Sequence, residues 1–360
     1  MCTSQWPSVI LYDSHIPLTE YAQQIDEEML PFDGRNLTKK FLLESGARAL
    51  FIRSVTKIDQ SIIAGTRLRF IGTCTAGYEH VDVQALRLNG IVFTHAPGSN
   101  ALPVVEYVLI ALHEWSIKQD KKLSDLTIGI IGLGEIGKRV AKMCLALGMK
   151  VLASDPPLES YGMQMIQGVQ WVGLKQLCAS SDCISIHSAL TFGALFPTHG
   201  LITERYVSSM KKDGLLIQAA RGGIVNEQAL LHGMNNANLH SAIDVWNKEP
   251  MWNQELANHP NTIMATPHIA GYTSAARKRG IDMIVEAYCK QMDAPFISQC
   301  AEHEGISFLD ECAVQTIKQR RFSEDRILWL QGKNPEAEIF DAGRKTFMFD
   351  EETLSEIASA

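Results

Sequence analysis

The sequence has no cysteine pair in C-x-x-C spacing, and its eight cysteines are scattered at positions 2, 74, 144, 178, 183, 289, 300 and 312. This scatter argues against a disulfide framework and a structural zinc site, and it predicts free thiols in a reducing compartment. The eleven histidines include no H-x-x-x-H pair beside an acid. We therefore expect no metal site.

The chain also lacks a basic excess and a long apolar run. Its 33 lysines and arginines against 40 acidic residues give a net charge of −7, which argues against nonspecific binding to nucleic acid. No apolar run is long enough to span a bilayer, and the first fifteen residues do not have the pattern of a secretory signal. We expect no membrane partner and a cytoplasmic protein.

What is present is a chain of 360 residues with 46% hydrophobic residues, enough for two or three domains. Short apolar strands alternate with helical stretches, which indicates parallel sheets covered by helices. The fold class we predict is α/β, with two doubly wound parallel-sheet domains of the Rossmann or flavodoxin type separated by a cleft. We assign residues 1–100 and 269–292 to a substrate-binding domain, 101–268 to a nucleotide-binding domain, and 293–360 to a small α+β dimerisation segment.

The first hundred residues supply four strand candidates, with helical stretches between them. The expected strands are Val9–Tyr12, Ala47–Ile52, Arg69–Gly72 and Ile91–Thr94, and the expected helices are Tyr21–Met29, Ile58–Ala64 and Val81–Leu88. The turn-rich Ala96–Asn100 then precedes a long apolar helix at Pro103–Trp115. A second long helix is expected at Ala275–Met292 and crosses back to the first domain.

The stretch Thr127–Asp155 has the pattern of a dinucleotide-binding unit. An apolar strand leads into Gly132-x-Gly134-x-x-Gly137, and an amphipathic helix follows. These glycines suit a tight turn, a close approach of the backbone to a pyrophosphate, and close packing of the helix on the strand. Asp155 ends the next strand at the distance expected for the carboxylate that binds the adenosine ribose. A carboxylate there favours NAD over NADP.

Later strands end at residues that have the chemistry of a 2-hydroxy acid oxidation. Because ligands in such sheets bind beyond the carboxyl ends of the strands, we examined the residues that follow them. His268 is a candidate base, Glu249 a partner that holds its ring, and Arg221 a planar cation for a carboxylate. Asp244 follows another strand end and is a candidate acceptor for a nicotinamide carboxamide.

The stretches GLGEIG, AARGGIVNE, DVWNKEP and TPHIAGYT resemble the D-2-hydroxyacid dehydrogenase family in order and spacing. The resemblance implies an NAD-dependent dehydrogenase with Arg221, Glu249 and His268 as catalytic residues. It also implies a set of residues at the cofactor: Gly132, Gly134, Glu135, Ile136, Gly137, Asp155, Ser188, Ala219, Ala220, Arg221, Asp244 and Gly271. The chain departs from the family at His187-Ser-Ala-Leu190, where His-x-Pro-Leu is common, and at Gln218, where Asn is usual.

Several stretches resemble one group of this family more narrowly, a group that acts on a phosphorylated 2-hydroxy acid: RSVTK at 53–57, GTCTAGYEHVD at 72–82, APGSNALPVVEYV at 96–108 and HIAGYT at 268–273. This resemblance implies Ser54, Thr75 and Tyr272 at the substrate. Arg53, Lys57, Arg277 and Lys278 are candidate partners of the phosphate, and the residues alone do not select among them. EIFDAGRKTF at 338–347 resembles the dimerisation segment of this group and implies a homodimer.

Two other readings remain open. The same chemistry suits other substrates, such as 3-phosphoglycerate, glyoxylate or hydroxypyruvate. A different class is an NAD sensor without catalysis, similar to corepressors that resemble this family, although a sensor has no need of a base paired with an acid.

Overall fold

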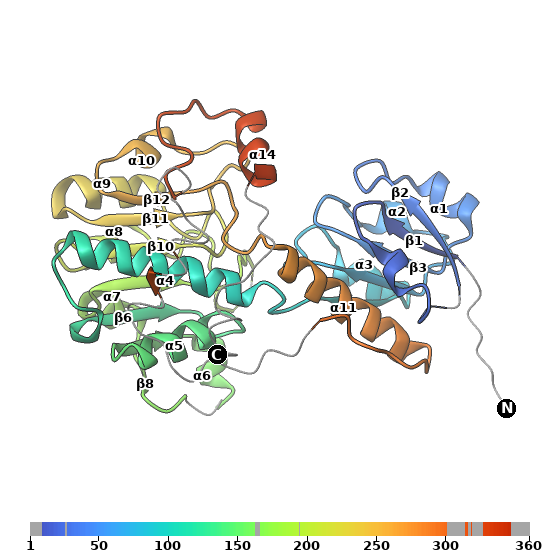
Figure 1. Cartoon of the computed structure of the whole chain (residues 1–360), viewed down its shortest axis with the longest axis horizontal. Helices are drawn as coiled ribbons and strands as arrows, with labels where there is room; N and C mark the ends of the chain where they lie inside the picture. The colour runs from blue at the N-terminus through green and yellow to red at the C-terminus, as the bar shows by residue number, and fades with distance from the viewer. Residues whose placement is uncertain are drawn as a thin grey trace. The chain divides into compact units, whose positions relative to one another are not determined.

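The computed structural model of the chain describes residues 9–25, 27–162, 166–193, 195–300, 314, 315, 318 and 327–346. These residues form two compact units (Figure 1). Unit 1 contains the described residues up to Asn100 together with those from Ala275 to Cys300. Unit 2 contains Ala101–Ser274 together with the described residues near the C-terminus.

Unit 1 is built on a five-stranded parallel sheet with the strand order β2-β1-β3-β4-β5. This is the flavodoxin-like order of a doubly wound sheet. The strands are β1 (Val9–Asp13), β2 (Glu28–Phe32), β3 (Ala49–Ile52), β4 (Phe70–Thr73) and β5 (Val92–His95). The short helices are η1 (Leu18–Tyr21), α1 (Lys39–Ser45), α2 (Gln60–Ile63) and α3 (Val83–Leu88).

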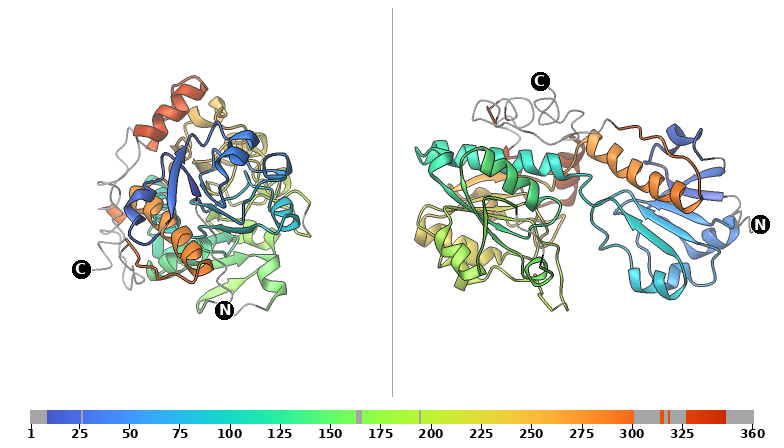
Figure 2. Two further views of the ribbon diagram at one scale, coloured as in Figure 1. Left: turned by 90° about the vertical axis from the view of Figure 1, so that its right-hand side faces the viewer. Right: turned by 90° about the horizontal axis from the view of Figure 1, so that it is seen from below.

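Helices cover both faces of this sheet (Figure 2). The long helix α11 (Ser274–Gln291) buries Ile281, Ile284 and Tyr288 against one face. Helices α1 to α3 bury their apolar residues on the other face. A Cβ atom at Gly72 in β4 would lie 2.2 Å from Cγ2 of Ile284, so the glycine allows α11 to pack directly on the strand.

The predicted helix Tyr21–Met29 is wrong. Residues 28–32 form β2, which pairs with β1 at the edge of the sheet, and only η1 precedes it. Tyr21, Ile25 and Met29 have the spacing of a helix face, but strand pairing overrides this local preference. An edge strand also accommodates Pro31, which has no N–H to donate.

Unit 2 contains a seven-stranded parallel sheet with the order β12-β11-β10-β9-β6-β7-β8. Strand β6 lies between β9 and β7, at the point where the strand order reverses, as in a dinucleotide-binding fold. The strands are β6 (Thr127–Ile131), β7 (Lys150–Ser154), β8 (Val169–Trp171), β9 (Cys183–Ile186), β10 (Leu215–Gln218), β11 (His240–Ile243) and β12 (Thr262–Ala265).

Helices cover both faces of the second sheet as well (Figure 2). Alternate residues of β10 point to the two cores, with Leu215 and Ile217 in one and Leu216 in the other. The helices of this unit are α4 (Ala101–Lys118), η2 (Leu123–Asp125), α5 (Gly137–Ala146), α6 (Pro156–Ser160), α7 (Leu174–Ser180), α8 (Glu204–Val207), α9 (Glu227–Ala237), α10 (Gln254–Asn258) and α14 (Ala337–Thr346).

The prediction of two parallel-sheet α/β units is confirmed. Most of the predicted dimerisation segment, 293–360, lies outside the described residues, and α14 is its described helix. Within the part of the chain that the structure describes, no helix combines the length and apolar character needed to cross a membrane.

Candidate active site

The glycine turn between β6 and α5 has the geometry of a phosphate-binding turn. Gly132 has a φ of +89°, and a Cβ there would lie 2.7 Å from the backbone nitrogen of Ser188. A Cβ at Gly137 would lie 2.0 Å from the Gly132 carbonyl oxygen, whereas Gly134 faces open space. Helix α5 begins at Gly137 with no side chain capping its N–H groups. The N-terminus of this helix therefore suits an anion such as a pyrophosphate.

Asp155 lies at the end of β7 and connects this turn to the next helix. Its Oδ2 accepts a hydrogen bond from Leu133 N at 2.7 Å, and its Oδ1 accepts one from Leu158 N at 3.1 Å as the N-cap of α6. A carboxylate has about four lone-pair positions. Asp155 can therefore still accept a bond from a ribose hydroxyl.

Glu135, in the same turn, pairs with two cations of helix α5. Its carboxylate bonds to Lys138, and at 2.7 Å to Nη1 of Arg139. Burial raises the pKa of Glu135, but these two cations outweigh it and leave the pKa below the ordinary value. Glu135 and Ile136 therefore contribute backbone to the turn.

After β9, His187 and Ser188 approach the glycine turn. The Nε2 atom of His187 lies 2.8 Å from Ser185 Oγ, and burial lowers the pKa of His187 to about 3. The imidazole is therefore neutral at physiological pH. The Ser188 hydroxyl is buried and has no hydrogen-bond partner among the described residues, which leaves it available to a bound cofactor.

The segment Ala219–Arg221 follows β10 and is held by Gln218. The Gln218 side chain donates to the Arg221 carbonyl oxygen at 2.8 Å and accepts from Ala220 N at 3.4 Å. Arg221 also donates from Nη1 to the Ala220 carbonyl at 2.8 Å. Gln218, which stands where the family usually has the shorter Asn, thus bonds to both ends of the turn that carries Arg221.

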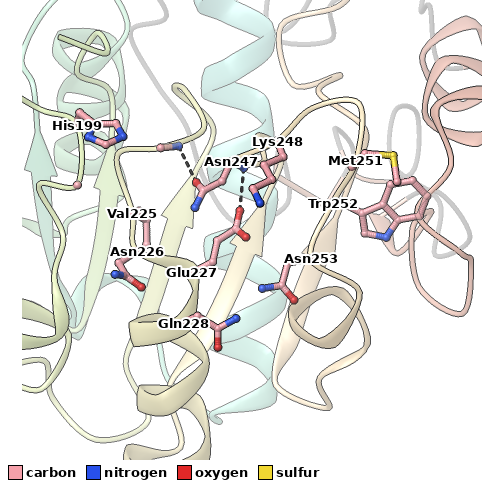
Figure 3. Close-up of a pocket in the computed structure, with 12 residues that line it drawn as sticks. His199, Val225, Asn226, Glu227, Gln228, Asn247, Lys248, Met251, Trp252 and Asn253 are labelled. Atoms are coloured by element: carbon pink, nitrogen blue, oxygen red, sulfur yellow. Dashed lines mark hydrogen bonds between the residues drawn. The ribbon is translucent and has the colours of Figure 1, made fainter. Parts of the chain in front are cut away.

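The loops that carry Arg221 and Glu249 are joined by Asn247, a residue that the sequence did not single out. Asn247 Oδ1 accepts from Gly223 N at 2.6 Å, and Asn247 N donates to Glu227 Oε1 at 2.9 Å (Figure 3). A Cβ at Gly222 would lie 1.9 Å from the Trp246 carbonyl oxygen, so the two loops touch through backbone. The arrangement fixes Arg221 and Glu249 relative to each other.

Residues of these loops, among them Gly223 and Asn247, line a cavity of about 670 Å³ (Figure 3). Its lining includes four amide side chains: Asn226, Gln228, Asn247 and Asn253. Glu227 also lines it, and burial raises the pKa of this carboxyl. The cavity does not include Arg221, Glu249 or His268.

His268 and Glu249 form a directly bonded pair. His268 Nδ1 lies 2.8 Å from Glu249 Oε2, and the two side chains are 34% and 26% exposed. Glu249 Oε1 accepts from Trp246 N at 2.9 Å. Burial raises the pKa of Glu249, but the charge and the hydrogen bond of His268 outweigh it and hold the pKa below the ordinary glutamate value. The ionised carboxylate orients the ring, so that Nε2 is the nitrogen left for proton exchange with a substrate.

The turn that carries His268 is held by Asp244. His268 has a φ of +56°, and its N–H donates to the Asp244 carbonyl oxygen at 2.8 Å. The buried carboxylate of Asp244 accepts from Ile269 N at 2.7 Å and from Ala270 N at 2.9 Å. Burial raises the pKa of Asp244, while His268 and these donors oppose the shift. Asp244 therefore has a structural task in addition to the cofactor contact expected from the sequence.

A buried hydroxyl chain continues from Asp244 into helix α4. The hydroxyl of Thr266 donates to Asp244 Oδ1 at 2.6 Å, and Tyr107 Oη lies 3.0 Å from that hydroxyl. Since Thr266 uses its proton for Asp244, Tyr107 is the donor of the second bond. The position of the His268 turn thus depends on a residue from a distant helix, which sequence reasoning missed.

Gly271 and Tyr272 end the same turn, with Tyr272 N donating to the Ile269 carbonyl oxygen at 2.9 Å. The guanidinium carbon of Arg344, in α14, lies 5.5 Å from the centre of the Tyr272 ring. The sequence pointed to the segment around Arg344 for dimerisation, not for this site.

Ser54 and Thr75 belong to unit 1. They follow β3 and β4, which are neighbouring parallel strands, so both lie at the same edge of that sheet. Ser54 is exposed, and Thr75 Oγ1 bonds to Thr73 Oγ1 and to the Gly77 carbonyl, each at 2.8 Å. Nearby, Arg53 pairs with the buried Asp13 at 3.0 Å.

No group of three or more potential metal ligands occurs in the portion of the chain for which the structure gives positions.

Comparison with known proteins shows which family the chain resembles. Residues 109–270 match the family described as D-isomer specific 2-hydroxyacid dehydrogenase, NAD binding domain. The chain is similar to erythronate-4-phosphate dehydrogenase of Proteus mirabilis HI4320, with 37% identity over 312 residues that cover 86% of this chain and 79% of that protein. It is also similar to erythronate-4-phosphate dehydrogenase of Acinetobacter baylyi, with 36% identity over 78% of this chain and 76% of that protein.

Solved structures give the same picture of the fold. A glyoxylate reductase from Paecilomyes thermophila matches with a TM-score of 0.65 and 23% identity over 83% of this chain and 100% of its own. A D-lactate dehydrogenase from Aquifex aeolicus, complexed with NAD and lactic acid, matches with a TM-score of 0.63 and 26% identity over 79% of this chain and 96% of its own.

Proposed function

The chain belongs to the erythronate-4-phosphate dehydrogenase family and itself matches the D-isomer specific 2-hydroxyacid dehydrogenase, NAD binding domain, and we propose that it oxidises 4-phospho-D-erythronate to 2-oxo-3-hydroxy-4-phosphobutanoate. The protein is an NAD-dependent oxidoreductase. The single observation that best supports the proposed reaction is the bonded pair of His268 and Glu249 in the NAD-binding unit.

The residues around the glycine turn fit the cofactor. The open side of Gly134 and the uncapped N–H groups of α5 suit a pyrophosphate, and the remaining acceptor capacity of Asp155 suits a ribose with a free 2′-hydroxyl. The buried hydroxyl of Ser188 adds a further donor beside the turn. When bound, NAD accepts the hydride from C2 of the substrate.

His268 takes the proton of the C2 hydroxyl at Nε2 as this hydride leaves. Glu249 holds the ring through Nδ1 and stabilises the imidazolium that forms. Arg221 binds the substrate carboxylate as a planar fork and polarises the C2 oxygen. We assign Tyr272, Ser54 and Thr75 to binding the remainder of the substrate.

The test is a panel of 2-hydroxy acids offered to the purified protein with NAD, with the formation of reduced nicotinamide followed by absorbance. We expect the highest kcat/KM for 4-phospho-D-erythronate. A higher kcat/KM for 3-phosphoglycerate, or for glyoxylate or hydroxypyruvate in the reverse direction, would contradict the substrate assignment. It would leave the proposed hydride and proton transfer unchanged. A protein that binds NAD and turns over none of these acids would indicate a sensor.

We further propose that the reaction serves pyridoxal phosphate biosynthesis in the cytoplasm, and that the protein is a homodimer to which residues 293–360 contribute. The family name supports the biosynthetic role, and the resemblance of 338–347 to a dimerisation segment supports the homodimer. Sedimentation of a chain that ends near residue 292 tests the second, because an unchanged dimer would contradict it.

A further inference from the structure

Arg344 in α14 lies beside residues assigned above to the reaction, although it is distant from them in sequence. Its guanidinium carbon is 5.5 Å from the centre of the Tyr272 ring, and its charge helps to lower the pKa of Glu249. Helix α14 belongs to the same unit as both residues (Figure 1). A cation from the stretch that the sequence assigned to dimerisation therefore borders the candidate site.

The position of Arg344 is determined by close packing of α14. Phe340 is buried and stacks on Trp252, which lies three residues after Glu249, with ring centres 6.3 Å apart. A Cβ atom at Gly343 would lie 2.6 Å from Cγ of Pro267, so this glycine lets the helix touch the residue before His268. These contacts place the next residue, Arg344, at the turn that carries the base.

The contacts of Arg344 leave hydrogen-bonding capacity for a ligand. The guanidinium packs on a ring, and such a contact does not itself use the N–H groups along the edge of the guanidinium. Its Nε is buried and has no hydrogen-bond partner among the residues that the structure describes. A buried N–H of a cation without an acceptor is costly, and a doubly charged anion is the partner that would satisfy it best.

We propose that Arg344 binds the phosphate group of the substrate, while Arg221 binds the carboxylate at its other end. This inference rests on the proposed function, because that substrate carries one carboxylate and one phosphate. Tyr272 then serves as the surface on which the guanidinium is held. The segment that sequence analysis assigned to dimerisation also contributes to substrate specificity.

The test compares 4-phospho-D-erythronate with D-erythronate, which lacks only the phosphate. We expect Arg344→Ala to lower kcat/KM for the phosphorylated acid about 10- to 100-fold, the range for a charge-assisted hydrogen bond, and to change it less than about threefold for D-erythronate. Arg344→Lys should recover part of the loss. Lys345→Ala is the matched control, since Lys345 is exposed on the same helix and should leave both values unchanged.

Equal falls for both acids would overturn the proposal, since they would indicate that Arg344 acts only through Glu249 or through the fold. A ratio of kcat/KM for 4-phospho-D-erythronate to kcat/KM for D-erythronate that stays the same in Arg344→Ala would overturn it as well. Thermal melting of each variant separates loss of the fold from loss of the contact.

Direct binding of inorganic phosphate, followed by calorimetry, separates this inference from the proposed function. We expect the NAD-bound protein to bind phosphate and Arg344→Ala to lose about 10-fold or more in affinity. If no erythronate is turned over but this loss is observed, the anion site stands and the substrate assignment fails. If the unmodified protein does not bind phosphate, the anion site is refuted.

Discussion

The two units differ in how tightly their candidate site residues are held. In unit 2, hydrogen bonds that involve the side chains of Gln218, Asn247 and Asp244 fix the segments that carry Arg221, Glu249 and His268. In unit 1, Ser54 is exposed, and Thr75 is held through a short chain of hydroxyls. From this difference we predict that proton transfer depends on rigid geometry in unit 2, and that the residues of unit 1 adjust the affinity for a substrate.

Replacing the base should give the largest effect. We expect His268→Ala to lower kcat about 100- to 10,000-fold, the usual contribution of a general base, without weakening the binding of NAD measured by fluorescence titration. The chain offers a matched control in His232, which pairs with Glu204 at 3.0 Å but on the surface. His232→Ala should keep full activity. A fall of less than about tenfold for His268→Ala would remove it as the base.

Glu249→Gln should rank second, with a loss of about 100-fold in kcat, because the amide cannot stabilise the imidazolium.

The same change tests the contribution of the Glu249 charge to the stability of the fold. Since the pKa of Glu249 is lowered from 4.5 in the folded protein, its carboxylate stabilises the fold above that pH, and this contribution is lost as the pH falls through the lowered pKa.

The difference in Tm between the unmodified protein and Glu249→Gln should therefore shrink as the pH falls from neutrality to values below the lowered pKa of Glu249. A constant difference over this range would mean that the charge of Glu249 does not contribute to stability.

A substitution at Asp155 tests whether the cofactor-binding residues of unit 2 are as sensitive to replacement as its catalytic residues. Asp155→Ser keeps an N-cap acceptor for α6 but removes the charge near the ribose. We expect about a 10-fold rise in the KM for NAD with a smaller change in kcat, together with a weaker preference over NADP in initial-rate measurements. An unchanged ratio of kcat/KM for NAD and NADP would exclude Asp155 from the choice of cofactor.

The smallest effect is expected in unit 1. Thr75→Val removes one neutral hydroxyl, so KM for the substrate should rise about three- to tenfold while kcat stays within about threefold. Thr75→Ser should behave like the unmodified protein. A loss of kcat as large as that of Glu249→Gln would contradict the contrast between the units.

The residues that the sequence predicts well are those whose position follows from a local rule. The glycine turn and Asp155 lie in one strand-turn-helix stretch, and Arg221, Asp244 and His268 follow strands whose carboxyl ends share an edge. Topology alone therefore places them together.

What the sequence did not predict depends on contacts between distant segments. Tyr107 reaches Asp244 through Thr266, and Arg344 reaches Tyr272 from a helix near the C-terminus. Tyr107 and Arg344 lie in stretches that resemble the family, but nothing in those stretches shows which distant residue each one contacts. The strand β2 was missed for a related reason, because only its pairing with β1 distinguishes it from a helix.

The left-handed backbone of His268 has a practical consequence for capturing this protein with its ligands. Asparagine is among the few residues besides glycine that occupy a positive φ readily, and it cannot act as a proton acceptor at neutral pH. His268→Asn should therefore preserve the turn and the bonds from Ile269 and Ala270 to Asp244 while stopping turnover. Such a variant is the form to crystallise with NAD and unreacted substrate together.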